Sequence, residues 1–170
     1  YHEQLYIYPI KSLRPISVES AAIGRYGFVH DRVFMLLKVH RDSETHDVTR
    51  LENMHVSGFP RMALFLMSFD VEEGSENGGL KKVVVSYTPP KSMSPEQPSH
   101  AAASDQIRFP LQPATQDLEN IQIEMHKSPT AAYNMGALYN DWFSIRFGHE
   151  VILAFVGSNS RAVLGNLSPN

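Results

Sequence analysis

The stretch YIYPIKSLRPISVESAAIGRYGFVHDRVFML, residues 6–36, carries two polar sites beside apolar, alternating segments. Lys11 and Ser12 follow the first segment, and Asp31 and Arg32 precede the third. Alternation of apolar and polar residues over a few positions is typical of half-buried strands. Each polar site is therefore expected where a strand ends or begins.

Prolines and glycines divide this stretch into short pieces. Pro9 and Pro15 are expected at strand ends, because proline has no N–H to donate to a strand ladder. Gly24 and Gly27, in the sequence GRYG, predict a turn that brings the second strand back toward the third.

Short segments rich in β-branched and aromatic residues continue to about residue 127, separated by proline, glycine or charged clusters. They are QLYIY, PISVESAAI, VFMLLKVH, RMALFLMSFDVE, KKVVVSYT, QIRFPL and NIQIEMHK. A series of short strands without an intervening helical period favours an antiparallel barrel or sandwich over a βαβ fold. The sequence predicts a mostly β, antiparallel, barrel-like fold with one C-terminal α-helix.

The helical period appears after Pro129. Leu138, Trp142 and Ile145 recur at helical spacing, which predicts a helix over about residues 135–147 with this stripe turned to the core.

The flanks of this helix carry the expected signals. Asn134 is the expected N-cap and Gly148 the expected C-terminal stop. EVILAFV, residues 150–156, follows as an expected buried strand.

The domain organisation follows from these patterns. Residues 1–127 are expected to form the β-barrel-like domain, interrupted by a Pro- and Ser-rich insertion at 88–105 that is expected to be flexible. Residues 128–170 are expected to be a helix and strand that lead toward a further part of the polypeptide.

Composition excludes several classes of function. The formal net charge of -3 provides no broad basic field for a nucleic acid. The chain has no cysteine, so it can supply neither a disulfide nor a thiolate ligand to a metal. The sequence contains no run of 18 or more apolar residues, so no membrane-spanning helix is predicted. No Ser-His-Asp arrangement, spaced carboxylate pair or regular metal-ligand spacing is recognisable, so neither catalytic nor metal-binding residues are expected.

The side chains at the two polar sites have the chemistry to bind an anion. Lys11 and Ser12 offer an ammonium and a hydroxyl, while Arg32 offers a planar guanidinium that Asp31 could orient. Arg50, at the expected end of a hairpin's return strand, could add a third basic group. Such residues at strand ends are also commonly solvated polar caps, so residue chemistry alone leaves both interpretations open.

The combination of LYIYPIKSLRPI, GFVHDRVFMLL, VTR and FPRMALF resembles the N-terminal β-barrel domain of MOSC proteins. This group includes the mitochondrial amidoxime-reducing component and the C-terminal part of molybdenum cofactor sulfurase. The most specific parts are Tyr-Pro-Ile-Lys-Ser and Asp-Arg-Val-Phe, in the right order and spacing. The segment from residue 128 looks like the connection from that barrel to the catalytic MOSC domain, which is expected beyond residue 170.

The resemblance implies a role in binding the molybdenum cofactor, molybdopterin. Lys11, Ser12 and Arg32 match the residues that reach the cofactor's phosphate, and Arg50 is the candidate added from residue chemistry. The family binds molybdenum through a cysteine of the MOSC domain, so this part of the chain is expected to be inactive by itself. The parent protein is expected to be an oxidoreductase or a sulfur-transfer protein.

Partners follow from the same resemblance: the C-terminal MOSC domain of the same polypeptide, a small-molecule substrate and an electron-transfer partner. An intracellular location, cytoplasmic or mitochondrial, is favoured. Pyridoxal phosphate binding is sometimes inferred for the group, but no lysine can be singled out here as a Schiff-base former. The alternative from another class is a non-enzymatic β-domain whose segment 88–105 engages a protein partner.

Overall fold

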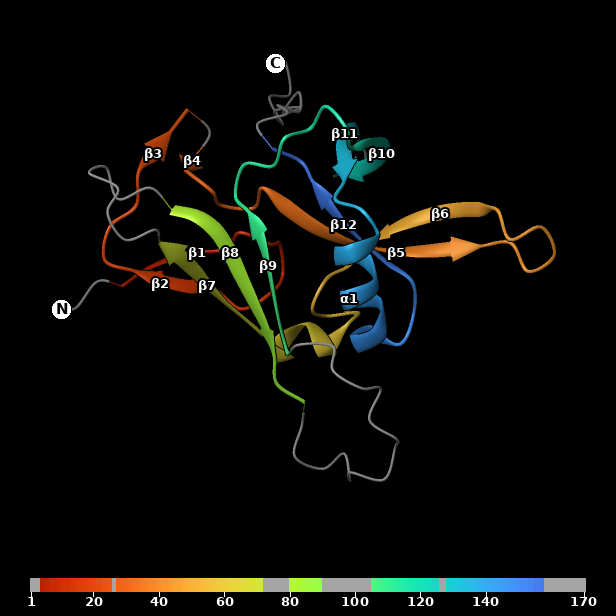
Figure 1. Cartoon of the computed structure of the whole chain (residues 1–170), viewed down its shortest axis with the longest axis horizontal. Coiled ribbons are helices and arrows are strands. Elements are labelled where there is room, and N and C mark those ends of the chain that lie inside the picture. Colours follow the sequence, from red (N-terminus) through yellow and green to blue (C-terminus); the bar gives the residue numbers. More distant parts are fainter. Residues whose placement is uncertain (1–3, 26, 72–79, 90–104, 126–127, 158–170) are drawn as a thin grey trace, which may run out of the picture.

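The structure, a computed structural model, describes residues 4–25, 27–71, 80–89, 105–125 and 128–157 (Figure 1). Its elements are β1 (Leu5–Ile7), β2 (Ile16–Val18), β3 (Ile23–Gly24), β4 (Gly27–Phe28), β5 (Phe34–Arg41), β6 (Val48–Asn53), the 3₁₀ helix η1 (Pro60–Leu64), β7 (Phe65–Val71), β8 (Leu80–Tyr87), β9 (Gln106–Pro110), β10 (Glu119–Met125), β11 (Ser128–Asn134), α1 (Ala137–Phe147) and β12 (Val151–Phe155). Every pairing between these strands is antiparallel. The predicted fold class is confirmed.

The largest sheet has five strands in the order β10-β11-β12-β5-β6. Its two edge strands, β6 and β10, approach each other. The contact between them is a hydrogen bond from the side-chain amide of Asn53 in β6 to the main-chain carbonyl of Glu124 in β10. The sheet is therefore curled into a half-barrel. A three-stranded sheet, β7-β8-β9, and two small hairpins, β1-β2 and β3-β4, complete the described sheets.

Strand β5 is the centre of the core because it is buried on both faces. Phe34 and Leu36 belong to the main hydrophobic cluster, which also contains α1 and the three-stranded sheet. Met35 and Leu37 belong to a second cluster inside the half-barrel. All four side chains are at most 2% exposed. A strand covered on both sides reads as a continuous apolar run, which explains the sequence VFMLLKV.

The segment before the first predicted basic site lies along the start of β5. Phe34 donates its N–H to the carbonyl of Pro9 at 3.0 Å, and Lys11 donates to the carbonyl of Phe34 at 3.0 Å. Ile10 forms a parallel bridge with Phe34 and is fully buried. Main-chain hydrogen bonds and core packing thus fix residues 8–11 on the central strand.

The prolines lie at strand ends as predicted, and the GRYG turn is present, but it joins β3 to β4 instead of bringing the second predicted strand to β5. Pro9 follows β1 and Pro15 directly precedes β2. Gly24 and Gly27 are paired across the β3-β4 hairpin, and Gly27 has a φ of 124°, a conformation that L side chains rarely adopt.

Three strand predictions need correction. PISVESAAI is not one strand but two short ones, β2 and β3. The segment RMALFLMSFDVE begins as the helix η1, and its strand starts only at Phe65. Strand β11 was missed, because Ser128 and Pro129 at its start look like a break in the pattern; as the start of a strand they are acceptable.

The boundary between residues 127 and 128 stays a prediction. Strands β11 and β12 nevertheless belong to the five-stranded sheet, where β12 pairs with β5 over five residues. The greater part of the segment 88–105 lies outside the described residues.

Helix α1 forms close to the predicted range, but it is turned differently. Leu138 is 73% exposed and Ile145 is 60% exposed, so their placement in the core is wrong, whereas Trp142 of the same predicted stripe is buried as expected. The buried face carries Trp142, Phe143, Arg146 and Phe147. The charged Arg146 on this face obscured the pattern in the sequence. Its guanidinium lies 3.8 Å from the centre of the Trp142 ring and donates a hydrogen bond to the Trp142 carbonyl, which helps the core to accept it.

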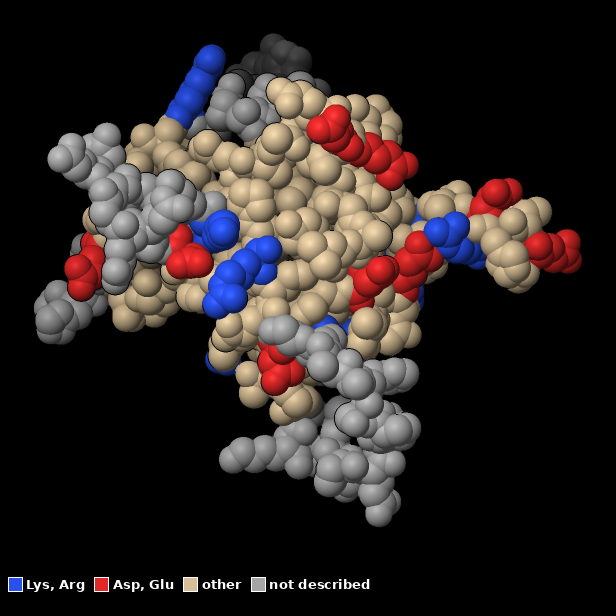
Figure 2. Space-filling view, viewed as in Figure 1, with Lys and Arg blue, Asp and Glu red and all other residues tan. Residues whose placement is uncertain are grey.

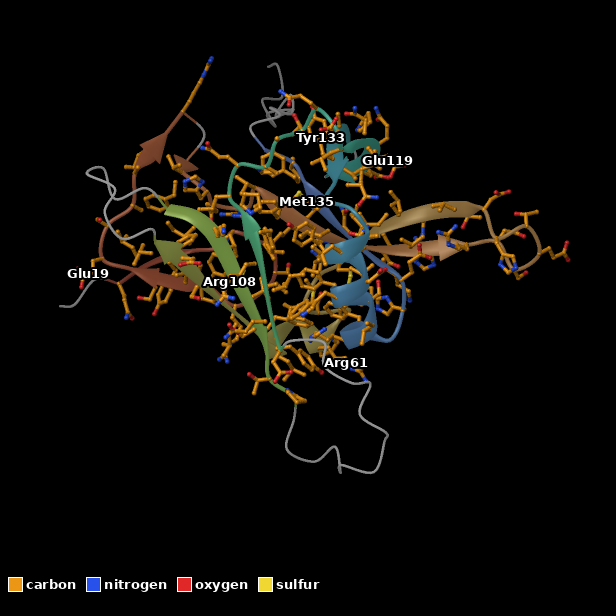
Figure 3. The ribbon with its side chains drawn as sticks, in the orientation of Figure 1. Glu19, Arg61, Arg108, Glu119, Tyr133 and Met135 are labelled. Atoms are coloured by element: carbon orange, nitrogen blue, oxygen red, sulfur yellow. The ribbon has the colours of Figure 1, made fainter. Side chains whose placement is uncertain are left out.

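The ends of the helix agree with the sequence only in part. Gly148 is the C-cap, with a left-handed φ of 76°, as predicted. The N-cap is Gly136 rather than Asn134. The Asn134 side chain still supports the helix start, since its oxygen accepts hydrogen bonds from the N–H of Gly136 and the amide of Asn140. At the other end, Arg61 donates to the carbonyls of the last helical turn (Figure 3).

The two-sided burial of β5 predicts unequal effects of the same substitution. Leu37→Ala is expected to lower the free energy of unfolding by about 2–5 kcal/mol, because it opens a cavity inside the half-barrel. Leu138→Ala, the matched control on the exposed face of α1, is expected to change it by less than about 0.5 kcal/mol. Urea unfolding measures both, and equal losses would contradict this packing.

Candidate functional site

Three non-glycine residues with positive φ lie at or beside the two predicted basic sites. Ser12 has a φ of 67°, His30 a φ of 69° and Arg32 a φ of 54°. Of the four non-glycine residues with positive φ in the described ranges, only His46 lies elsewhere. A side chain in this conformation costs about 1–2 kcal/mol relative to the ordinary one. Such residues cluster at functional sites, where the surrounding structure holds them in place.

The second basic site is organised by Asp31. Its Oδ1 accepts the N–H of Tyr8 at 2.9 Å, and its Oδ2 accepts Nε–H of Arg32 at 2.8 Å. The Asp31 side chain is 15% exposed and that of Arg32 is 68% exposed. An anchored carboxylate therefore orients an arginine whose remaining N–H groups face solvent, as the sequence suggested.

The first basic site lies in a pocket of about 370 Å³ with an arginine from β6. Lys11 and Arg50 both line it, so the structure brings together two of the predicted residues. Arg50 lies within β6 rather than at its end, which corrects the sequence expectation. Ser12 and Arg32 are not among the residues that line this pocket.

Lys11 and Arg32 belong to neighbouring segments. Arg32 donates its N–H to the carbonyl of Tyr8 at 2.7 Å, three residues before Lys11. Three residues span at most about 11 Å of chain. The two residues are therefore close along paired segments, and their joint contact with a single anion stays a prediction.

The pocket also contains groups that sequence reasoning missed. Glu52, His55 and Glu124 line it beside the two cations. Glu52 had a detectable signal, because in an alternating strand it shares a face with Arg50 two residues earlier. Glu124 had none, since only the curl of the sheet brings β10 to β6.

Glu52 contacts both Arg50 on its own strand, β6, and His40 on the paired strand, β5. Its Oε2 lies 3.2 Å from Nη2 of Arg50 and 2.6 Å from Nε2 of His40. The hydrogen bond from His40, and then the charges of Arg50 and Lys38, lower the pKa of Glu52. Arg50 is thereby held in place, but a negative ligand must compete with a carboxylate for it.

Figure 2 shows acidic side chains toward the tip of the β5-β6 hairpin and basic ones nearer the body of the molecule. Arg41 forms a bidentate pair with Glu150, with both contacts at 2.7 Å. Asp42 accepts the N–H groups of Glu44 and Thr45, which shapes the turn and lowers the pKa of its carboxyl. Arg41 thus ties the hairpin to the residue before β12, and Asp42 is used within the hairpin's own turn.

A second groove continues from the pocket between the two edge strands. It measures about 550 Å³ and shares Arg50, Leu51 and Glu124 with the pocket. Its remaining lining comes from Val48 and Thr49 in β6 and from β10 and β11. Arg50 thus lies at the open seam of the half-barrel, and Lys11 lies in the pocket next to it.

Comparison with known families shows to which family the chain belongs. Residues 2–150 match the model of the MOSC N-terminal beta barrel domain. The chain belongs to this family. Neither a curated protein nor a solved structure matches the chain. Within the described residues, no helix has the length and apolar character needed to cross a bilayer.

The left-handed conformation of Ser12 makes a prediction about stability. Ser12→Gly is expected to unfold with a free energy about 1 kcal/mol higher than Ser12→Ala, because glycine adopts positive φ without strain. Ser17, an exposed residue of strand β2, is the matched control. There the glycine variant is expected to be the less stable of the two, by about 0.5–1 kcal/mol. The same order at both positions in denaturant unfolding would refute the strain at Ser12.

Proposed function

We propose that this MOSC N-terminal domain contributes to binding the phosphate of a molybdenum cofactor through Lys11, Ser12, Arg32 and Arg50. The observation that carries the proposal is the pocket that Lys11 and Arg50 both line. Ammonium and guanidinium groups are the side chains that best match phosphate oxygens. The Asp31-oriented guanidinium of Arg32, on the neighbouring segment, would supply a further contact.

The residues present fit a phosphate better than they fit a metal. The chain has no cysteine, so a thiolate for molybdenum must come from another part of the protein. The cofactor, when bound, would supply redox chemistry at its metal. Lys11 and Arg50 would hold its phosphate end, and Ser12 would offer a hydroxyl donor. The domain's own role is binding and orientation.

The counter-charges in the pocket limit the affinity of this domain alone. Glu52 already pairs with Arg50, and Glu124 lines the same space. A few polar contacts at about 1–3 kcal/mol each, reduced by the cost of association, give a dissociation constant on the order of 1 mM or weaker. Tight binding requires a second surface that closes the pocket and excludes water.

That second surface is, in this proposal, the C-terminal MOSC domain of the same polypeptide. Its cysteine would bind molybdenum, and a small-molecule substrate and an electron-transfer partner would meet the cofactor there. The whole protein would then act as an oxidoreductase or a sulfur-transfer protein. Family membership supports this assignment.

Titration of this chain with phosphate tests whether Lys11, Arg50 and Arg32 bind the anion. With inorganic phosphate followed by ¹⁵N-resolved NMR, the double variant Lys11→Ala plus Arg50→Ala is expected to bind at least about tenfold more weakly, because it loses both charge-assisted contacts. Arg32→Ala is expected to weaken binding by a smaller factor. Glu52→Gln is expected to strengthen it, since the substitution releases Arg50 from its carboxylate partner.

The matched control is Lys82→Ala plus Arg108→Ala, which removes the same charge from the three-stranded sheet. It is expected to leave the phosphate affinity within about twofold. Equal losses in the two double variants would show a general charge effect. That outcome, or an unchanged affinity in the pocket variant, would defeat the proposal.

A further inference from the structure

A second pocket lies beside the β3-β4 hairpin and measures about 360 Å³. Its volume is within the range of small-molecule sites. Leu111 and Phe155 line it and also belong to, or pack against, the main core. Phe28 and Val29 line it as well, and they are 38% and 37% exposed. The pocket therefore has an apolar lining that extends from the core to solvent-exposed side chains.

A small set of polar groups lines the same pocket. His30 has a left-handed φ of 69°, and burial lowers the pKa of its imidazole, which is therefore neutral near pH 7. A neutral imidazole has one N–H donor and one acceptor nitrogen. Gln112 adds an amide with both kinds of group. Arg25 also lines the pocket and carries a guanidinium, which has donors only. Hydrogen-bond donors and acceptors are thus both available.

Asp31 completes this polar set. Each of its carboxylate oxygens accepts one hydrogen bond from the protein, from Tyr8 and from Arg32. A carboxylate has lone pairs for about four hydrogen bonds, so Asp31 can also accept an N–H from a ligand. Arg32 pairs with this carboxylate and Arg25 lines the same pocket, so an uncharged ligand suits the site better than a cation.

The backbone gives a second reason to assign a site here. His30 and Arg32, two non-glycine residues separated by one position, are both held at positive φ. The turn between them presents His30 and Asp31 to the pocket. Strain of this kind is retained where it places functional side chains. Concave apolar lining, a few polar groups and a strained turn therefore coincide.

We propose that this pocket binds a small, flat, mostly apolar molecule with an uncharged carboxamide-type head. The apolar body would lie against Phe28, Val29 and Phe155. The head would donate N–H to Asp31 and exchange hydrogen bonds with His30 or Gln112. The inference goes beyond the phosphate site and does not need it, although Asp31 contacts the arginine of that site.

The probe for this pocket is 2-naphthamide, which has an aromatic body and a carboxamide. Titrated into the ¹⁵N-labelled chain, it is expected to shift the main-chain amides of Gly24, Gly27 and Gly157 and the side-chain amide of Gln112. The expected dissociation constant is on the order of 1 mM, as for a ligand of this size with ordinary efficiency.

Two variants with matched controls locate the binding. Val29→Trp fills the exposed part of the pocket and is expected to weaken binding at least about fivefold, whereas Val48→Trp in the β6-β10 groove is not. His30→Gly removes the imidazole and relieves the strained φ, so the fold is retained while the affinity falls. His46→Gly, at a φ of 61° in the β5-β6 turn, is its control.

The outcomes separate this inference from the phosphate site. Saturable shifts that are confined to the pocket support the inference. They are expected to be lost in Val29→Trp or His30→Gly. They are expected to remain in the controls and in the double variant Lys11→Ala plus Arg50→Ala. No saturable shift up to about 10 mM, shifts centred on the β6-β10 groove, or equal effects in variants and controls would overturn it. If Val29→Trp fails to fold, His30→Gly decides the matter.

Discussion

The docking of residues 8–11 onto the start of β5 is the constraint on which the rest of the structure depends. Ile10 and Phe34 are both fully buried, and three main-chain hydrogen bonds join the two segments. Because β5 is covered on both faces, the segment attached to it is as fixed as the core itself. Lys11 directly follows the buried Ile10, and Arg32 lies in the turn that precedes β5. The positions of both predicted cations therefore follow from packing.

This attachment also explains how the strained turns persist. Ser12 and Arg32 each carry a left-handed backbone that costs about 1–2 kcal/mol. Burial of a side chain such as Phe34 or Ile10 contributes about 1.5–3 kcal/mol, so the packing on either side of each turn is large enough to offset the strain. Asp31 adds a local tie, because it bonds the main chain of one segment and the guanidinium of the other. A stable core thus supports two polar turns and the apolar pocket next to them.

The sequence predicts the parts of this molecule that depend on local pattern. The alternation of apolar and polar residues and the positions of the prolines predicted short antiparallel strands. The family resemblance predicted that they form a barrel-like domain. Leu138 and Ile145 were placed in the core wrongly, because the true stripe is interrupted by Arg146, whose burial depends on its stacking against Trp142. That Lys11 and Arg50 line one pocket was only a possibility in the sequence, and the role of Glu124 was hidden altogether. The first depends on the docking of residues 8–11 onto β5, which pairs with β6, and the second on the curl that brings β10 to β6. Both are long-range properties with no local signal.

Native-state hydrogen exchange of the main-chain amides tests the central claim most directly. If the N-terminal segment is fixed on β5, the amides of Lys11, Arg32 and Phe34 exchange only with global unfolding, at the same free energy as that of Leu36 in the middle of β5. The amide of Glu44, in the exposed β5-β6 turn, serves as the rapidly exchanging reference. Exchange of Lys11 and Phe34 by local opening, at a free energy well below that of Leu36, would contradict the account.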